Sequence, residues 1–164
     1  MEDAARPLNK RGRKGAAAVG KWLEDEGLRP GLVLCSSARR TRETLELLHG
    51  ALGARVPIQI EPGLYLADAA SLLARLRHIP REVASVMVIA HNPGLQELVA
   101  ELAAAPGAAA ANARARLHKK FPTGALARFR LKLDDWRSLS PDAPSGTVKL
   151  LKVITPAQLG AGKD

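Results

Sequence analysis

The stretch VMVIAHNPGL (residues 86–95) joins a short apolar run to the start of a helix. Its first four residues are apolar, as in a strand of a parallel sheet that is buried on both faces. Asn92 is a residue type that caps helices, and Pro93 suits the first helical position. An apolar helical pattern follows over residues 93–102. The segment therefore predicts a strand over 85–90 that leads directly into a helix, with His91 at the junction.

The same alternation of strand and helix extends along the chain on both sides of this segment. Before it, the periodicity predicts a helix over 9–27, a strand over 32–36, a helix over 38–52, a strand over 56–60 and a helix over 68–78. After it, the residues 126–133 alternate apolar and basic types, and 148–154 form another apolar run, so both are predicted strands. We predict neither a helix nor a strand for the alanine-rich stretch 103–115.

These elements predict an α/β fold, a three-layer α/β/α sandwich around a mainly parallel sheet. The last two strands have no comparable helix between them, so we expect them to add an antiparallel edge. A chain of 164 residues can bury roughly two-thirds of its unfolded surface in one core. Residues 1–164 are therefore predicted to form a single domain.

Composition narrows the environment of the protein. No stretch approaches the roughly 18 to 20 apolar residues of a membrane span. The first residues, MEDAARPLNKRGRKG, are basic but lead into no apolar signal region, so a cytoplasmic location without membrane contact is expected. The single cysteine, Cys35, excludes an internal disulfide and offers no metal-ligand spacing. A metal site built on cysteines is therefore not expected.

The chain is strongly basic, with 25 Lys and Arg against 16 Asp and Glu, a formal charge of +9 and a pI near 10.3. Such a charge attracts anions, including phosphates, nucleic acids and acidic proteins. Aromatic residues make up only 3% of the chain, which is too few for the stacking platforms of single-strand binders. Nucleic acid is therefore not the expected partner.

The segment LVLCSSARRTRETLELL (32–48) places arginines in the first turns of a helix that follows a buried strand. Ser36 or Ser37 is predicted to cap this helix. Arg39 has Glu43 four residues on, and Arg42 has Glu46 at the same spacing, so both can form ion pairs along the helix. Arg40 faces Thr44 and is predicted to be free to bind an anion such as phosphate. The alternative is a solvated basic helix face.

His91 is the second candidate, because it lies where a strand ends and the free N–H groups of a helix begin. A protonated imidazole there could stabilise the charge of a phosphoryl group. The alternative is a core histidine whose ring is satisfied by a backbone carbonyl. The other histidines, His49, His78 and His118, are predicted to be structural.

Cys35 raises the question of a thiolate phosphatase, in which an arginine follows the cysteine by six positions. Thr41 occupies that position here, so the spacing does not fit. Cys35 is therefore predicted to be a buried strand residue.

The motifs together resemble the histidine phosphatase superfamily, which has the phosphoglycerate-mutase-like fold, and within it the small SixA-type phosphohistidine phosphatases. The resemblance covers nearly the whole chain. Its motifs are ARPLNKRG (5–12), LVLCSSARRTRETLELL (32–48), EPGLY (61–65), VMVIAHNPGLQELV (86–99) and FPTGALARF (121–129), with a late Trp136.

The resemblance implies roles for particular residues. It makes Arg40 the phosphate-binding arginine and His91 the second histidine, which stabilises the transferring phosphoryl group; these are the predicted catalytic residues. Ser36 opens the arginine motif, whereas Ser37, Thr41 and Glu43 depart from its commonest residues. Ser37 and Asn92 join Arg40 in the predicted substrate-binding set.

Members of this family begin with a strand that ends in R-H-G or R-H-A, whose histidine is the nucleophile. The 164 residues contain no such motif, so we expect the first strand to be missing, through a truncated start or a degenerate family member. The implied activity is hydrolysis of phosphohistidine or a small phosphoester through a covalent phosphohistidine, impaired in this form. This implied mechanism requires no metal and no cofactor. Glu61 and Asp68 are the candidate acids for the leaving group.

The implied partners are a phosphorylated substrate, which is a phosphohistidine protein or a small phosphoester, and phosphate-like anions. A competing hypothesis is a non-catalytic basic module that binds nucleic acid or an acidic protein. It predicts salt-sensitive binding that survives the substitution Arg40→Ala.

Overall fold

The computed structural model describes residues 1–161, and these fall into two compact units. The first unit contains residues 1–65, residues 83–90 and the chain from Thr155 on, and the second contains residues 66–82 and 91–154. Each unit has its own sheet. The single domain over residues 1–164 stays a prediction. No helix in the described part of the chain has the length and apolar character needed to cross a membrane.

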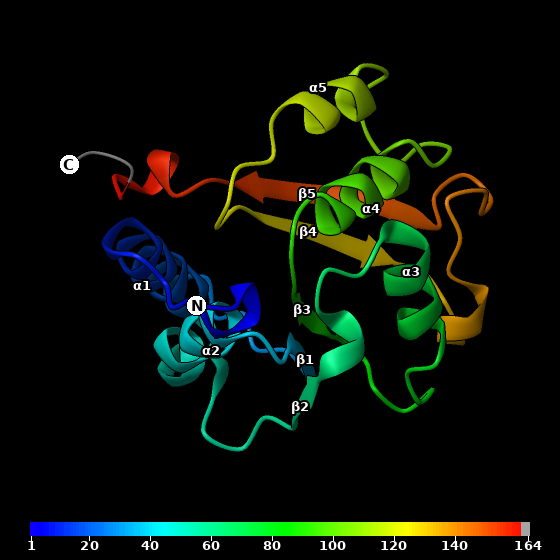
Figure 1. The fold of residues 1–164 in the computed structure, drawn as a ribbon. Coiled ribbons are helices and arrows are strands. Elements are labelled where there is room, and N and C mark those ends of the chain that lie inside the picture. Colours follow the sequence, from blue (N-terminus) through cyan, green and yellow to red (C-terminus); the bar gives the residue numbers. More distant parts are fainter. Residues whose placement is uncertain (162–164) are drawn as a thin grey trace. The chain divides into compact units, whose positions relative to one another are not determined.

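The first unit contains a three-stranded parallel sheet in the order β2-β1-β3 (Figure 1). Its strands are β1 (Val33–Ser36), β2 (Ile58–Glu61) and β3 (Met87–Ile89). Cys35 of β1 lies opposite Ile60 of β2 and Ile89 of β3. The central strand β1 is completely buried, which is why its sequence is a continuous apolar run.

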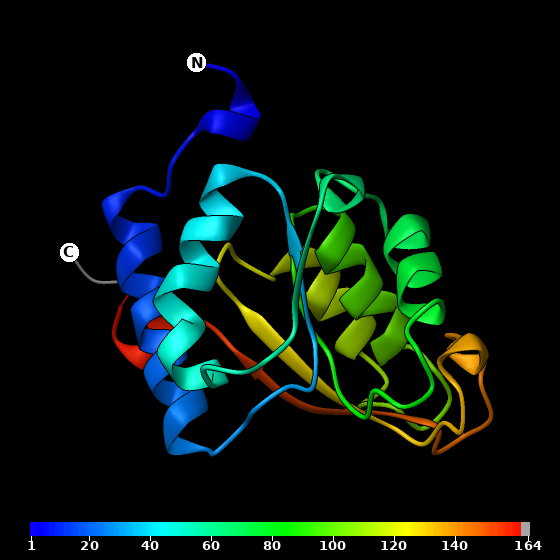
Figure 2. The same ribbon diagram turned by 90° about the horizontal axis from the view of Figure 1, so that it is seen from below.

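Two long helices, α1 (Lys10–Asp25) and α2 (Arg39–Leu52), pack against each other in the first unit (Figure 2). Asn9 caps α1, because its Oδ1 accepts a hydrogen bond of 2.8 Å from the Gly12 N–H. Gly27 follows the end of α1 with a φ of +66°, a conformation that favours glycine. Three 3₁₀ turns complete this unit: η1 (Asp3–Ala5), η2 (Pro62–Leu64) and η4 (Ala157–Leu159).

The predicted cap of α2 by Ser36 or Ser37 is wrong. Ala38 occupies the N-cap position, and no side chain caps the helix. Ser36 is the last residue of β1 and is fully buried, and its Oγ accepts a hydrogen bond of 3.3 Å from the Ala38 N–H. The Ser36 hydroxyl therefore bonds the backbone two residues later and closes the turn between strand and helix. It does not reach the N–H groups of the first helical turn.

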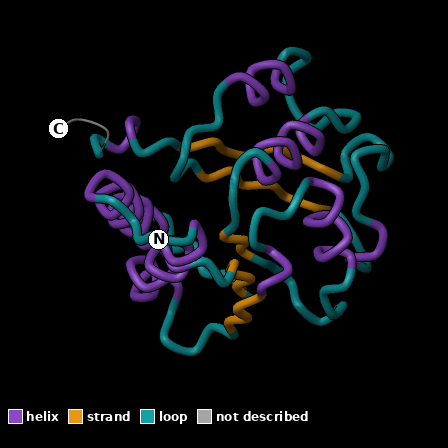
Figure 3. Tube along the Cα trace, viewed as in Figure 1, coloured by secondary structure: helices purple, strands orange, loops and turns teal. Residues whose placement is uncertain are grey.

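The second unit contains three helices and an antiparallel pair of strands (Figure 3). The helices are α3 (Ala69–Arg77), α4 (Gly94–Ala103) and α5 (Ala113–Lys119), with a 3₁₀ turn η3 (Trp136–Ser138). The strands are β4 (Leu126–Leu131) and β5 (Val148–Ile154). Pro93 occupies the N-cap of α4, one position before the predicted one.

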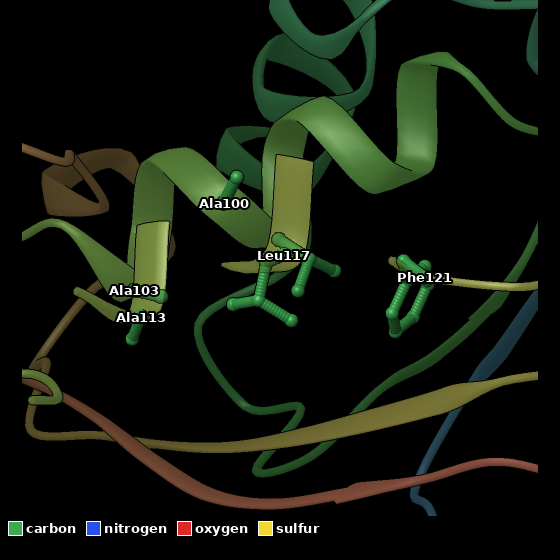
Figure 4. Close-up of a cluster of buried hydrophobic side chains, with 6 residues drawn as sticks. Ala100, Ala103, Ala113, Leu117 and Phe121 are labelled. Atoms are coloured by element: carbon green, nitrogen blue, oxygen red, sulfur yellow. The ribbon is translucent and has the colours of Figure 1, made fainter. Parts of the chain in front are cut away.

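A hydrophobic cluster between α4, α5 and the strands forms a core of the second unit (Figure 4). Ala100 and Ala103 of α4 pack with Ala113, Leu117 and Phe121. Apolar residues of the two strands pack against this cluster: Ala127, Phe129, Leu150 and Val153. The sequence predicted no helix in the alanine-rich stretch. α5 forms at its end because Ala113 and Leu117 lie on one helical face and pack on this cluster.

The α/β fold with a parallel sheet and an antiparallel pair is confirmed. β4 and β5 pair antiparallel, with an irregularity in register between Arg128 and Phe129. Within residues 1–161, however, these strands pair only with each other, so they form a separate two-stranded sheet and do not extend the parallel sheet as an edge.

Candidate phosphoryl-binding site

The first part of the site is the carboxyl edge of the parallel sheet in the first unit. β1 ends at Ser36, and α2 begins three residues later. The first N–H groups of a helix have no partner within the helix and carry a partial positive charge, so this end of α2 favours an anion. In open parallel sheets, ligands bind at this edge. Arg40 lies in the first turn of α2.

Asp3 binds the Arg40 side chain. Nη1 of Arg40 donates to the Asp3 carbonyl at 3.0 Å, and Nη2 lies 3.2 Å from the Asp3 carboxylate. The prediction that Arg40 has no carboxylate partner is therefore wrong. Spacing along a helix reveals only partners three or four residues away, whereas Asp3 comes from the 3₁₀ turn η1, 37 residues earlier.

Tyr65 completes a cluster with these two residues, the Asp3–Arg40–Tyr65 cluster. Its hydroxyl donates to the Asp3 carboxylate, and the centre of its ring lies 6.0 Å from the Arg40 guanidinium carbon. The hydrogen bond from Tyr65 and the charge of Arg40 lower the pKa of Asp3, and the same hydrogen bond raises the pKa of Tyr65. Sequence reasoning missed both residues, although Tyr65 ends the EPGLY motif.

Arg40 remains accessible despite this pairing. Its side chain is 19% exposed and that of Asp3 is 46% exposed, so the ion pair faces solvent. Two guanidinium nitrogens already hold oxygen acceptors in the geometry that suits two oxygens of a phosphoryl group. An anion that binds Arg40 must therefore compete with Asp3.

We expect the substitution Asp3→Asn to raise the affinity for oxyanions, because it removes the competing charge from Arg40. The expected increase is roughly fivefold, the size associated with an exposed ion pair. Titration calorimetry with tungstate measures it, and the substitution of the exposed neighbour, Glu2→Gln, is the control. An unchanged affinity for the Asp3→Asn protein would show that Asp3 does not occupy the anion site.

The predicted pairing of Arg39 with Glu43 is confirmed at 2.9 Å. The same carboxylate accepts a hydrogen bond of 2.7 Å from the Leu8 N–H and lies 3.3 Å from Arg13. Glu43 thereby fixes the segment before α1 against α2.

Arg42 does not use the acceptor that was predicted for it. Its Nε donates to the Ser37 carbonyl at 3.1 Å, so the expected Glu46 is not the acceptor of this bond.

Acid should release this segment. The Leu8 hydrogen bond, followed by Arg39 and Arg13, lowers the pKa of Glu43, and the pKa of Asp3 is also lowered. Their stabilising contribution is complete above the unfolded values of about 4 and is lost as the pH falls through the lower folded values. We expect Tm to fall with pH below about 4, less steeply in Glu43→Gln. Equal slopes in thermal unfolding scans would contradict this role of Glu43.

His91 is the first residue of the second unit after β3 and is buried, with 8% of its surface exposed. Its carbonyl accepts a hydrogen bond of 2.9 Å from the Leu95 N–H, which fixes the backbone at the start of α4. One residue, Ala90, separates it from Ile89, the end of β3. The predicted junction of strand, histidine and helix is therefore present.

Asn92 fixes this junction through both ends of its side chain. Its Nδ2 donates to the Phe121 carbonyl at 2.8 Å, and its Oδ1 accepts from the Gln96 N–H at 3.2 Å. The substrate-binding role of Asn92 stays a prediction, as does that of Ser37, which is half-buried before α2.

Gly94 brings the first turn of α4 against the backbone before α3. A Cβ at this position would lie 1.9 Å from the Ala67 carbonyl oxygen. The chain therefore requires a glycine here, three residues after His91. This close approach was not predicted, because the contacting carbonyl is far away in the sequence.

The two candidate acids differ in their environment. Asp68 caps α3, and its Oδ1 accepts a hydrogen bond of 2.8 Å from the Ser71 N–H. This bonding lowers the pKa of Asp68, which favours the carboxylate and opposes a role as proton donor. Glu61 ends β2 and is half-buried, so it is the better placed candidate of the two.

Cys35 is completely buried, and its burial raises the pKa of the thiol to about 11. We expect the native protein to resist thiol-specific reagents near neutral pH, because the thiolate is the reactive form. Absorbance with a chromogenic disulfide reagent, before and after denaturation, measures this. Rapid labelling of the native protein would contradict the predicted inert strand residue.

The other histidines lie in the last turn of a helix or directly after one. His49 is in the last turn of α2, and His118 is in the last turn of α5. His78 follows α3, with its Nδ1 2.7 Å from the Ala74 carbonyl oxygen. Among residues 1–161, no group of three or more His, Cys, Asp or Glu side chains is arranged to hold a metal ion.

Comparison with known proteins identifies the family. Residues 3–69 match the model of the histidine phosphatase superfamily (branch 1), and this range contains the Asp3–Arg40–Tyr65 cluster. The chain belongs to the histidine phosphatase superfamily. An uncharacterized protein of Mycobacterium tuberculosis is 32% identical over 141 residues, which are 86% of this chain and 85% of the relative. The phosphohistidine phosphatase SixA of Escherichia coli is 33% identical over 61% of this chain and 63% of its own.

Solved structures show the same fold as this member of the superfamily. A putative phosphohistidine phosphatase SixA from Nakamurella multipartitia has a TM-score of 0.77 at 26% identity, and the match covers 95% of this chain and 88% of that one. The histidine phosphatase SixA complexed with tungstate has a TM-score of 0.73 at 28% identity, over 97% and 90% of the two chains.

Proposed function

We propose that this histidine phosphatase family member binds phosphohistidine, or a small phosphoester, through Arg40 and His91. The observation that carries the proposal is the register of the parallel sheet. β1 and β3 are neighbours with Cys35 opposite Ile89, so their carboxyl ends share one edge. Arg40 follows the end of β1 by four residues, and His91 follows the end of β3 by two. The tungstate complex of a similar SixA protein supports an oxyanion ligand.

Each residue has a distinct role in the proposed chemistry. The Arg40 guanidinium binds two non-bridging oxygens of the phosphoryl group, once Asp3 has been displaced. A protonated His91 adds a second positive donor, and its burial strengthens that interaction. Both groups stabilise the charge on the phosphoryl oxygens as the phosphorus changes partner.

Turnover requires a nucleophile in addition to these two groups. A histidine nitrogen would form the bond to phosphorus as the leaving group departs, and water would then hydrolyse the phosphohistidine. In the described residues, His91 alone of the four histidines lies within two residues of the end of a strand of the parallel sheet. We therefore propose that the 164-residue chain binds the phosphoryl group without turning it over.

The chemistry of the leaving group also indicates which class of substrate the site suits. An imidazole leaving from phosphohistidine needs less assistance from an acid than an alkoxide leaving from a phosphoester. Asp68 is held as a carboxylate, and only Glu61 remains of the two candidate acids. This favours phosphohistidine, carried on a protein, over an alkyl phosphoester.

The test measures binding and turnover with the same protein. We expect the 164-residue chain to bind tungstate in titration calorimetry and to release no nitrophenol from p-nitrophenyl phosphate. His91→Gln should weaken tungstate binding by about tenfold, the value of one charged hydrogen bond. Ordinary turnover that His91→Ala abolishes would show that another residue is the nucleophile. Failure to bind tungstate, both in this chain and in one extended upstream, would refute the proposed function.

A further inference from the structure

The positive charge of the chain is concentrated in one segment of the second unit. Residues 102–133 contain no Asp or Glu, whereas the whole chain has a formal charge of +9. Seven cationic residues lie in this segment: Arg114, Arg116, Lys119, Lys120, Arg128, Arg130 and Lys132. β5 adds Lys149 and Lys152 and also has no acidic residue. The charge is therefore a local property of α5, β4 and β5.

The antiparallel pair places like charges directly opposite each other. Arg128 of β4 lies opposite Lys152 of β5, and Arg130 lies opposite Lys149. All four residues are exposed and define the basic sheet face. Side chains opposite each other in an antiparallel pair are about 5 Å apart at Cβ, and like charges at this distance destabilise the sheet. Each of these two cross-strand pairs therefore contributes a repulsive contact between like charges.

Nothing in the second unit neutralises this face. The opposite side of the strands is apolar and packs on the cluster beneath α4 and α5 (Figure 4). Within residues 1–161, none of the four cations forms a salt bridge. The repulsion is therefore not compensated inside the described chain.

A shallow cavity of about 420 Å³ adjoins the basic sheet face at β5. Its cationic lining residues are Arg116 of α5 together with Lys149 and Lys152. The rest of the lining is apolar, and it includes no carboxylate. The Leu150 N–H in this wall is bonded to the Ala108 carbonyl at 3.0 Å, so the cavity offers side-chain cations and apolar surface to a ligand.

We propose that the basic sheet face and this cavity form the docking surface for an acidic protein. Carboxylates of the partner would lie between the opposed cations and relieve their repulsion. The face and the cavity together offer five cations, Arg116 and the four opposed residues, which is fewer than the roughly 6 to 10 phosphate contacts of a strongly salt-dependent nucleic-acid binder. Phe129 is the one aromatic residue of the two strands, and it packs into the core. That this partner is the phosphorylated substrate protein rests on the proposed function.

The probe for this surface is poly-L-glutamate, and binding is followed by fluorescence anisotropy at low and at physiological salt. The variant Arg130→Gln/Lys149→Gln removes one opposed pair of cations. Its control, Lys21→Gln/Arg55→Gln, removes two exposed charges of the first unit, so the net charge of the two variants is equal. We expect the first variant to bind about tenfold more weakly and the control to change less than about twofold.

A second readout separates docking from folding. Removal of the opposed pair should raise Tm, because it relieves repulsion, while the affinity for polyglutamate falls. The tungstate affinity should stay unchanged, so failure of docking and failure of the phosphoryl site are distinguishable. Equal loss of binding in both variants would overturn the proposal in favour of net charge alone. Tighter binding of a short DNA duplex than of polyglutamate at equal salt would also overturn it.

Discussion

The substitution Arg40→Ala should reduce the affinity for tungstate by about 100-fold, since two charge-assisted hydrogen bonds are lost. Arg40 lies in the first turn of α2 and already holds two oxygens of Asp3 with its terminal nitrogens. An oxyanion in this position gains both the guanidinium and the N–H groups at the start of the helix. Alanine leaves only the helix terminus, which contributes much less.

The matched control for this prediction is Arg39→Ala. Arg39 is the preceding residue and has the same charge, but its Nε is bonded to Glu43 at 2.9 Å and its side chain is 49% exposed. Its removal should change tungstate affinity by less than about threefold. Titration calorimetry of both variants at one salt concentration makes the comparison. Similar losses in the two variants would mean that tungstate is attracted by general positive charge and that Arg40 has no special position.

The sequence predicted those parts of the protein that depend on local patterns. The apolar runs of β1 and β3 and the helices that follow them lie within two residues of their predicted positions. Arg40 and His91 were recognised because each is unusual for its place at a strand end. The capping of α1 by Asn9 depends on a neighbour three residues away and was also predictable.

The features that the sequence missed depend on contacts between distant segments. Tyr65 and Asp3 are 62 residues apart, so no periodicity could reveal that they share a hydrogen bond. α5 was missed because alanine repeats give no apolar face, and the helix depends on tertiary packing of Leu117 and Phe121. The predicted cap of α2 was wrong for a related reason, because the burial of Ser36 decides which backbone N–H its hydroxyl can reach.

Gly94→Ala should destabilise the protein by about 3 kcal/mol, at the upper end of the cost of overpacking. A Cβ at position 94 would lie 1.9 Å from the Ala67 carbonyl oxygen, far inside any real contact. The clash is with backbone, so no flexible side chain can move aside. Either the first turn of α4 or the segment before α3 must shift, and His91 lies three residues before Gly94.

The control for Gly94→Ala uses the same change of residue in an open position. Gly50 lies on α2, is exposed and has no atom near the position of a Cβ. Gly50→Ala should therefore stabilise the protein by about 0.5 to 1 kcal/mol, through the higher helix propensity of alanine. Urea unfolding of the two variants should give changes of opposite sign. If Gly94→Ala is as stable as the parent protein, the close approach between α4 and Ala67 does not exist, and the position of His91 must be reconsidered.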